Sequence, residues 1–326
     1  MHRVVFRRIL NSIPLLFLIS LFSFVLMRAA PGDPVAMYMS TDLENADPEA
    51  VERVRESLGL HRPMHVQYWA WLTRAVRGDL GVSYLTRRPV TDVIFEVLPN
   101  SMLLAGISLP LAVIIGVSLG VATAIWRRSW LDYIVTTVVF IGYSIPSFYL
   151  ALLLLYYLSF RYQLLPSSGM RSLRMGHDNP TVDVLLHAIM PLLTYTFVRL
   201  VVWVRFQRNS LIEVLSQDYL RTARAKGLSE RVVLLRHAWR NSLIPIITQL
   251  GLSFSGLVGG SFIIETIFAW PGIGRLGVES IRFRDYPVAM GILLISSIMI
   301  ILGNLISDVS YMMLDPRVNI EGKAGR

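Results

Sequence analysis

The sequence has 326 residues, of which 54% are hydrophobic and only 16% are charged, and its mean hydropathy is +0.54. In soluble domains about a quarter of the residues are charged, so this composition excludes an ordinary soluble protein and indicates a polytopic membrane protein. We expect the net charge of +9 to orient the chain in the membrane. No nucleic-acid-binding motif occurs. The absence of cysteine excludes disulfides, thiolate metal sites and cysteine nucleophiles.

Six apolar stretches are long enough to cross a bilayer, which needs about 20 predominantly apolar residues per helix. The first stretch follows a basic head, but its apolar run is too long for a typical signal core, so we interpret it as a retained span. The sixth returns the chain to the side from which it started. The expected spans are residues 9–29, 101–126, 134–160, 185–204, 243–268 and 287–313.

Arginine and lysine in the short loops and tails predict the orientation. Sixteen of them lie on the side of the two termini, against six in the short loops on the other side, so both termini are expected in the cytoplasm. The predicted organisation has a cytoplasmic N-terminus with the first span (1–29), an extracytoplasmic segment (30–99), a core with five spans (100–313), a cytoplasmic loop within that core (216–242) and a cytoplasmic tail (314–326).

The extracytoplasmic segment contains an amphipathic stretch rich in tryptophan and tyrosine, from Val66 to Val76. Such aromatic residues often lie at the level of the lipid headgroups. We expect this stretch to pack against the outer ends of the spans, in preference to contacting a transported molecule directly.

Four residues within the predicted spans are candidates for a translocation pathway. Arg199 is a charge at depth, although a side chain so near the end of its span can also snorkel to the interface. Glu265 could face a polar pathway or satisfy backbone groups of the following turn. Pro146 can kink its helix, and Asn304 stands among apolar neighbours and is expected to face the interior.

Between the fourth and fifth spans lies a basic stretch with two helical parts. Helix is expected over residues 217–226, with Leu215, Tyr219 and Ala223 on one face. Gly227 and Leu228 then have the pattern of a left-handed glycine cap. Ser229 can cap a second helix. A hairpin of this kind would either bind anionic lipids or dock onto a protein.

Residues 218–245, DYLRTARAKGLSERVVLLRHAWRNSLIP, resemble the cytoplasmic docking loop of permease subunits of ATP-binding-cassette importers, in the dipeptide, oligopeptide and nickel group. The resemblance covers nearly the whole chain. Further matching segments are APGDP (30–34), LGL (58–60), QYWAWL (67–72), GDLGVS (78–83), YSIPSF (143–148), ETIFAWPGIG (265–274), RDYPV (284–288) and DPR (315–317).

This resemblance implies an all-α membrane protein with six transmembrane helices, the type I importer permease fold, in a bacterial or archaeal plasma membrane. It implies as partners a second permease, two ATPase subunits and an extracytoplasmic binding protein. ATP and magnesium would bind to the ATPases, so this chain is expected to have no cofactor, metal or catalytic residue. The implied coupling residues are Asp218, Tyr219, Arg221, Thr222, Ala223, Arg224, Ala225, Lys226, Gly227 and Leu228.

The chain departs from the general permease pattern at one position that matters for docking. Where that pattern has Glu-Ala-Ala, this sequence has Arg221, Thr222 and Ala223, followed by Gly227. The acid that helps to fix the loop to the ATPase in other branches is therefore missing. We expect Asp218 or Arg221 to pair differently.

The expected cargo is a di- or oligopeptide, and the alternatives within the same architecture are nickel, glutathione or an oligosaccharide. A secondary transporter would need ionisable relays in mid-membrane, of which the spans contain few. A membrane hydrolase would need paired acids or a histidine constellation. His187 and His237 each stand alone near the end of a span, so we interpret them as ordinary polar residues.

Overall fold

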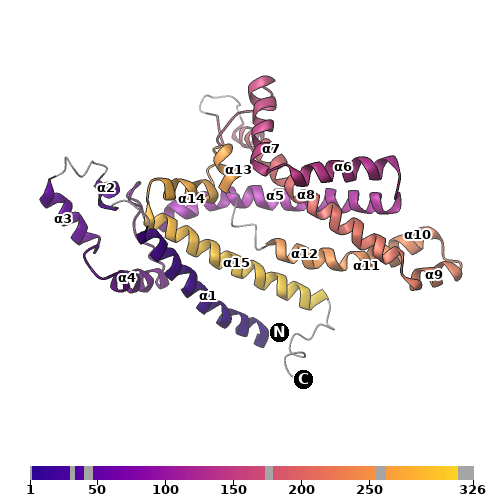
Figure 1. Cartoon of the computed structure of the whole chain (residues 1–326), viewed down its shortest axis with the longest axis horizontal. Coiled ribbons are helices and arrows are strands. Elements are labelled where there is room, and N and C mark those ends of the chain that lie inside the picture. Colours follow the sequence, from indigo (N-terminus) through magenta and orange to yellow (C-terminus); the bar gives the residue numbers. More distant parts are fainter. Residues whose placement is uncertain (1, 30–33, 40–46, 173–178, 255–261, 315–326) are drawn as a thin grey trace. The chain divides into compact units, whose positions relative to one another are not determined.

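A computed structural model describes residues 2–29, 34–39, 47–172, 179–254 and 262–314. Over these residues the regular elements are helices, apart from one isolated bridge between Val82 and Pro89 (Figure 1). The helices are α1 (His2–Ala29), α2 (Pro34–Met39), α3 (Pro48–Ser57), α4 (Met64–Val76), α5 (Val90–Ile125), α6 (Trp130–Ser144), α7 (Ser147–Leu154), η2 (Leu155–Arg161), α8 (Pro180–Leu215), α9 (Asp218–Ala225), α10 (Glu230–Val232), η3 (Val233–Trp239), α11 (Arg240–Ser242), α12 (Ile244–Phe254), α13 (Phe262–Ile267), α14 (Ile273–Arg282) and α15 (Tyr286–Leu314).

Four helices of the described residues are long and apolar enough to cross a membrane, and a bent pair of helices could supply a fifth span. The four match the first, second, fourth and sixth predicted spans. The fourth continues well past its predicted end at residue 204. The apolar segments are Phe6–Ala29, Val90–Ile125, Pro180–Leu215 and Tyr286–Ser307.

The third predicted span, residues 134–160, is not one straight helix. It forms α6 followed by α7 and η2, and the two halves are bent by 104° at the break. Pro146 precedes α7 with φ −60° and ψ 140°, and Ile145 before it is extended. Proline supplies no backbone N–H and excludes its predecessor from the helical region, so the chain turns here instead of kinking slightly.

The fifth predicted span, residues 243–268, is described only at its two ends. Ile244–Phe254 forms α12 and Phe262–Ile267 forms α13, which agrees with the predicted helical character. Residues 255–261, among them Gly256, Gly259 and Gly260, lie outside the described residues.

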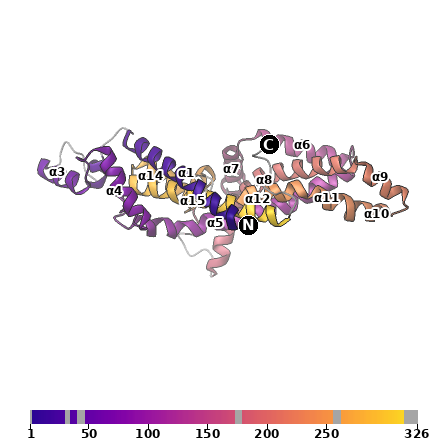
Figure 2. The same cartoon turned by 90° about the horizontal axis from the view of Figure 1, so that it is seen from below.

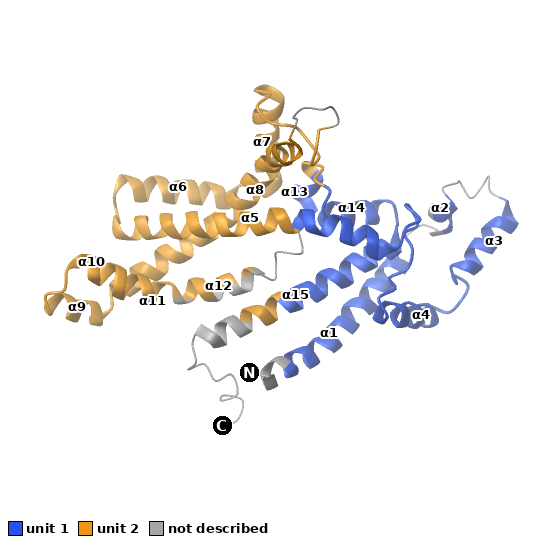
Figure 3. Ribbon diagram, turned by 180° about the vertical axis from the view of Figure 1, so that it is seen from behind, with its two compact units in different colours: residues 1–101, 258–266, 271–302 blue, residues 102–257, 267–270, 303–326 orange. Residues whose placement is uncertain are grey.

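The chain forms two compact units (Figure 3). Unit 1 comprises residues 1–101, 258–266 and 271–302, and its main core joins α1, α4 and the start of α15. Tyr68 and Trp71 of α4 are buried there against Phe24 and Met290. The Tyr68 hydroxyl lies 2.9 Å from the Ser20 hydroxyl of α1. Packing against the helix ends, the preferred interpretation of the aromatic stretch, is therefore confirmed.

Unit 2 comprises residues 102–257, 267–270 and 303–326, and its helices α5, α6 and α8 approach one another at glycines. A Cβ atom added at Gly116 would lie 2.5 Å from the Cβ atom of Trp203, and one at Gly120 would lie 2.8 Å from that of Gln207. The backbones of α5 and α8 therefore touch, as is usual where small residues line membrane helix contacts.

Candidate functional site

The predicted glycine turn is present after α9. Gly227 has φ +78°, its N–H donates to the carbonyl of Arg224 over 2.9 Å, and the N–H of Leu228 donates to the carbonyl of Ala223 over 3.4 Å. These two bonds define a Schellman motif, in which a left-handed glycine satisfies the last carbonyls of a helix. The chain thus reverses sharply, and α9 and α10 lie side by side at the end of α8 (Figures 1 and 2).

The buried side of α9 includes only part of the face on which Leu215, Tyr219 and Ala223 were expected. Leu220 is fully buried and Ala223 nearly so, whereas Tyr219 is 42% exposed. Tyr219 and Ala223, which were placed on one face, thus differ in burial. Leu220 and Ala223 lie three residues apart on one side of the helix, and this side packs against Val233 and Ala238 of η3. Tyr219 instead accepts a hydrogen bond from Asn241 at 2.9 Å.

The second helix, α10, begins at the expected place but lacks the expected side-chain cap. Ser229 occupies the N-cap position, yet its side chain makes no capping hydrogen bond, so that part of the prediction is wrong. Glu230 instead accepts two bonds across the turn from the Arg224 guanidinium, at 2.9 and 3.1 Å. The hydrogen bond from Arg224 lowers the pKa of Glu230 and raises that of Arg224.

Residues Val233–Trp239 of the second arm form a π-helical turn, which a periodicity argument does not detect. Such segments insert a residue into an α-helix and are frequent at functional sites. Here the segment turns Val233 and Ala238 toward α9.

A shared core attaches the helix pair, residues 218–242, to two long helices. α8 contributes Leu211 and α5 contributes Ala124. Gln207 of α8 donates to the Ser242 hydroxyl, and the Ser210 hydroxyl donates to the Ser242 carbonyl, both over 2.9 Å. A force applied to the helix pair is therefore transmitted to α5 and α8. The buried members of this core are Ala124, Leu211, Leu220, Ala223, Val233 and Ala238.

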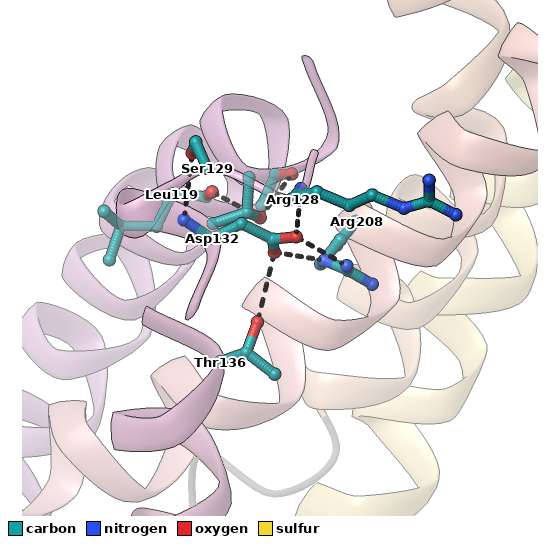
Figure 4. A network of polar contacts seen from close by, with 8 residues as sticks. Leu119, Arg128, Ser129, Asp132, Thr136 and Arg208 are labelled. Atoms are coloured by element: carbon teal, nitrogen blue, oxygen red, sulfur yellow. Dashed lines mark hydrogen bonds and ion pairs between the residues drawn. The ribbon is translucent and has the colours of Figure 1, made fainter. Parts of the chain in front are cut away.

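A buried ion pair joins α6 to α8 (Figure 4). The Arg208 guanidinium donates to both carboxylate oxygens of Asp132, over 3.0 and 3.1 Å. Asp132 also accepts bonds from the Arg128 N–H and the Thr136 hydroxyl. The sequence interpretation missed this pair. The Ser129-x-x-Asp132 spacing, a capping-box pattern, was the available signal.

The outer face of the helix pair carries the predicted coupling residues. Nine of the ten are exposed, and the tenth, Ala223, is buried. Asp218 and Arg221 pair with each other over 3.3 Å, and both side chains are largely in solvent. The helix pair thus has an inner face attached to α5 and α8 and an exposed, charged outer face.

Glu265, a pathway candidate in unit 1, is used for structure. Its side chain is fully buried and accepts bonds from the Ser101 hydroxyl at 2.9 Å and the Gly274 N–H at 2.7 Å. The Arg275 N–H lies 3.2 Å from the same carboxylate. Of the two open interpretations, the structure therefore supports the one in which Glu265 satisfies the turn and the first residues of α14.

The other three pathway candidates lie in different settings. The Arg199 guanidinium lies 5.5 Å from the ring centre of Tyr195, one turn toward the N-terminal end of α8, and its Nη1 atom is buried without a hydrogen-bond partner among the described residues. It does not extend toward Arg205, as the favoured snorkelling interpretation required. Pro146 is exposed at the start of α7. Asn304 is also exposed on this chain, and its place in a pathway stays a prediction.

Comparison with known proteins identifies relatives over the whole length of the chain. The oligopeptide transport system permease protein AppB of Bacillus subtilis (strain 168) is 40% identical over 319 residues, which is 98% of this chain and 99% of AppB. The glutathione transport system permease protein GsiC of Escherichia coli (strain K12) is 40% identical over 318 residues, with the same shares.

Among solved structures, a chain of the MetNI methionine ABC transporter in an inward-facing conformation has a TM-score of 0.54. It is 17% identical, and the alignment covers 69% of this chain and 97% of that one. This likeness shows the fold alone, that of a type I importer permease.

Two family descriptions match the sequence. Residues 1–105 match the N-terminal membrane component of binding-protein-dependent transport systems. Residues 112–320 match the family described as binding-protein-dependent transport system inner membrane component. An inner-membrane location agrees with the four long apolar helices. The chain is therefore a multi-pass membrane protein that belongs to the inner membrane component family of binding-protein-dependent transport systems.

Proposed function

We propose that this chain is one of two permease subunits of an importer driven by ATP hydrolysis, and that residues 218–228 dock into one of its ATPase subunits. The observation that carries the proposal is the helix pair, whose inner face packs on α5 and α8 while its outer face stays exposed and charged. Closure of the ATPases would then move α8 as a rigid body between two states, as alternating access requires.

This proposal includes an orientation with the helix pair and both termini in the cytoplasm. The excess of arginine on that side supports it. It also includes six spans, with the segment from residue 243 to 268 as the fifth and residues 30–99 outside the cell. An extracytoplasmic binding protein would then deliver the cargo to the outer side.

ATP and magnesium bind, in this proposal, to the partner ATPases. The sequence contains no Gly-x-x-x-x-Gly-Lys-Ser/Thr segment that could hold phosphates. The chain itself would therefore contribute no catalytic group. Its task is mechanical and consists of forming the pathway and coupling it to the nucleotide.

Di- or oligopeptides are the cargo we propose. The names of two relatives support a peptide, since AppB is an oligopeptide permease protein and GsiC a glutathione permease protein, and glutathione is itself a short peptide. Nickel and oligosaccharides remain the alternatives for this architecture. Ligand screening of the cognate binding protein by thermal shift would choose among them.

Arg199, Pro146 and Asn304 remain our pathway candidates, and Arg199 is the strongest of them. A guanidinium in the middle of a 36-residue apolar helix, with one buried nitrogen lacking a partner among the described residues, needs an anionic or polar partner. A peptide carboxylate passing through the membrane would be such a partner.

Transport by the reconstituted complex tests the proposal. Vesicles containing both permeases and both ATPases, supplied with the binding protein and a radiolabelled dipeptide, should accumulate the label only when ATP is present on the ATPase side. Uptake without ATP, driven by an ion gradient, would show a secondary transporter and overturn the proposal.

A further inference from the structure

Unit 2 contains a cavity of about 500 Å³ that none of the roles above uses. One face of α8 forms most of its wall, and the end of α6 and the start of α12 complete it. Cavities that bind small molecules typically have volumes of about 300–1,000 Å³. The wall residues are Tyr143, Val201, Val202, Arg205, Phe206, Asn209, Ser210, Glu213 and Pro245.

The polar side chains on this wall are accessible from outside the protein. Tyr143 is 71% exposed, and Arg205, Asn209 and Glu213 are exposed as well. The side-chain amide of Asn209 makes no hydrogen bond among the described residues. A ligand in the cavity can therefore reach these groups.

The wall changes from apolar to polar along α8. Its residues from 201 to 206 are apolar except for Arg205, whereas those from 209 to 213 are polar or charged. The change falls where the predicted fourth span ends, at residue 204. Val201 and Glu213 are about 18 Å apart along a helix axis, and the headgroup layer on each side of a bilayer is about 5–8 Å thick. The cavity thus extends from the hydrocarbon through the level of the headgroups.

Arg205 places a positive charge at this boundary. Its guanidinium carbon lies 5.9 Å from the ring centre of Tyr143, and because both residues line the cavity, this cation–π contact locates the charge at the wall. The guanidinium has no carboxylate partner among the described residues. Glu213 is two turns away, about 12 Å along the axis, and the nearby Arg208 is already paired with Asp132. One cation is therefore left for an anionic ligand.

We propose that this cavity binds a membrane phospholipid, with its phosphodiester at Arg205 and an acyl chain along the apolar part of the wall. A guanidinium suits phosphate because it presents several N–H donors in one plane. Asn209, one turn further along the same face of α8, adds an amide donor. Basic pockets between membrane helices on the cytoplasmic side are typical headgroup sites.

A lipid fits this wall better than a water-soluble anion does. The apolar residues Val201, Val202 and Phe206 lie on the membrane side of Arg205, at a depth where acyl chains are the solvent. Only an amphiphile satisfies both parts of the wall. The choice of the cytoplasmic leaflet rests on the proposed orientation, whereas the chemistry of the headgroup does not.

Native mass spectrometry of the complete transporter, delipidated in detergent, tests the site. The probe is dioleoylphosphatidylglycerol. Dioleoylglycerol has the same chains without the phosphate, and glycerol 3-phosphate has a phosphate without the chains. We expect the phospholipid to bind at least about tenfold more tightly than either, because each of the others lacks one half of the interaction.

Matched variants locate the binding. Arg205→Gln should weaken the tightest phospholipid site about tenfold, whereas Arg231→Gln, at an exposed arginine outside the cavity wall, should leave it unchanged. Tyr143→Leu removes the ring beside the guanidinium and should weaken binding about threefold. Its control is Tyr133→Leu on the same helix, where the side chain is 64% exposed and lies outside the wall. If the Arg205 variant fails to assemble, the tyrosine pair provides the test.

Several results would overturn the inference. Equal binding of dioleoylglycerol would remove the phosphate from the site, and equal binding of glycerol 3-phosphate would make it a site for free phosphate. Equal phospholipid binding by both members of a variant pair would place the lipid elsewhere. Displacement of the lipid by the dipeptide Ala-Phe would assign the cavity to the cargo, and loss of the second permease from the Arg205→Gln complex would assign it to that subunit.

ATP-dependent uptake with the binding protein is measured separately. A complex that binds the phospholipid through Arg205 but does not transport keeps this site and loses the proposed function. A complex that transports without such binding keeps the proposed function and loses only the site.

Discussion

Glu265 in unit 1 and Asp218 in unit 2 both lie in the first turn of a short helix, yet their surroundings are opposite. Glu265 is fully buried, and a hydroxyl and two backbone N–H groups of its own unit bind its oxygens. The side chain of Asp218 is 92% exposed, with Arg221 as its ion-pair partner. A buried and saturated charge stabilises the fold, whereas an exposed charge on a firmly attached helix remains available to another protein.

The largest effect is expected at Glu265. Glu265→Ala removes the acceptor of three buried donors, and each unsatisfied donor costs about 1–3 kcal/mol. We expect a loss of about 5 kcal/mol and little folded protein, measured as yield and Tm of the purified complex. Glu279→Ala, which breaks a half-exposed pair with Arg275, is the control and should change little. A Glu265→Gln variant that folds normally but abolishes transport would contradict the purely structural role.

Asp132 is a buried carboxylate of unit 2. Asp132→Ala leaves the Arg208 guanidinium without its bidentate partner, and because Arg208 is partly exposed we expect a cost below the roughly 3–5 kcal/mol of a fully buried pair. A lower Tm is expected, together with weaker coupling between ATPase activity and transport, because α6 and α8 lose their link. An unchanged Tm would show that the pair is not formed in the membrane.

Leu220 and Tyr219 are neighbours in the sequence that lie on different faces of α9, Leu220 on the buried face and Tyr219 on the exposed one. Leu220→Ala empties a fully buried position and should cost about 2–5 kcal/mol. Tyr219→Ala removes a half-exposed ring and one hydrogen bond, so the free energy of unfolding should fall by less than about 1.5 kcal/mol. The Tyr219 variant should remain nearly as stable as the wild type but co-purify with much less ATPase. The reverse pattern would show that Tyr219, and not Leu220, packs against the core.

A substitution at Gly227 tests whether the turn between α9 and α10 is needed for docking. Gly227→Val places a β-branched residue at φ +78°, a strain of about 1–3 kcal/mol, although no atom lies within 4 Å of the added Cβ. The variant should insert into the membrane but lose ATPase association in a pull-down. Gly78→Val is a matched control, with φ +84° and equally open space in unit 1. Loss of the ATPase in both variants, or in neither, would argue against docking at this turn.

The smallest effect concerns Glu230. Its lowered pKa means that the charged form stabilises the fold at pH values above the ordinary value of 4.5, and that this contribution is lost as the pH falls through the lowered value. Because the pair is exposed, it contributes about 0.5 kcal/mol. Glu230→Gln should therefore lower Tm slightly at pH 7 and not at pH 3. A constant difference at both pH values would exclude the ion pair as the cause.

Local features of the chain were predictable from its residues. Runs of apolar residues predict α1, α5, α8 and α15, because the length of a span follows from the thickness of the bilayer. The left-handed turn at Gly227 was also predictable, since only glycine adopts that conformation freely. The excess of arginine on one side supplied the proposed orientation.

Features that depend on distant contacts were decided by the tertiary structure. Whether Leu220 or Tyr219 is buried depends on Val233 and Ala238, which reach α9 only after the chain reverses. Asp132 meets Arg208, and Glu265 meets Ser101, across long intervals of sequence. The 104° bend at Pro146 is larger than the kink that we expected from the sequence. Sequence determines which groups are polar or apolar, but burial and pairing are set by neighbours that only folding brings together.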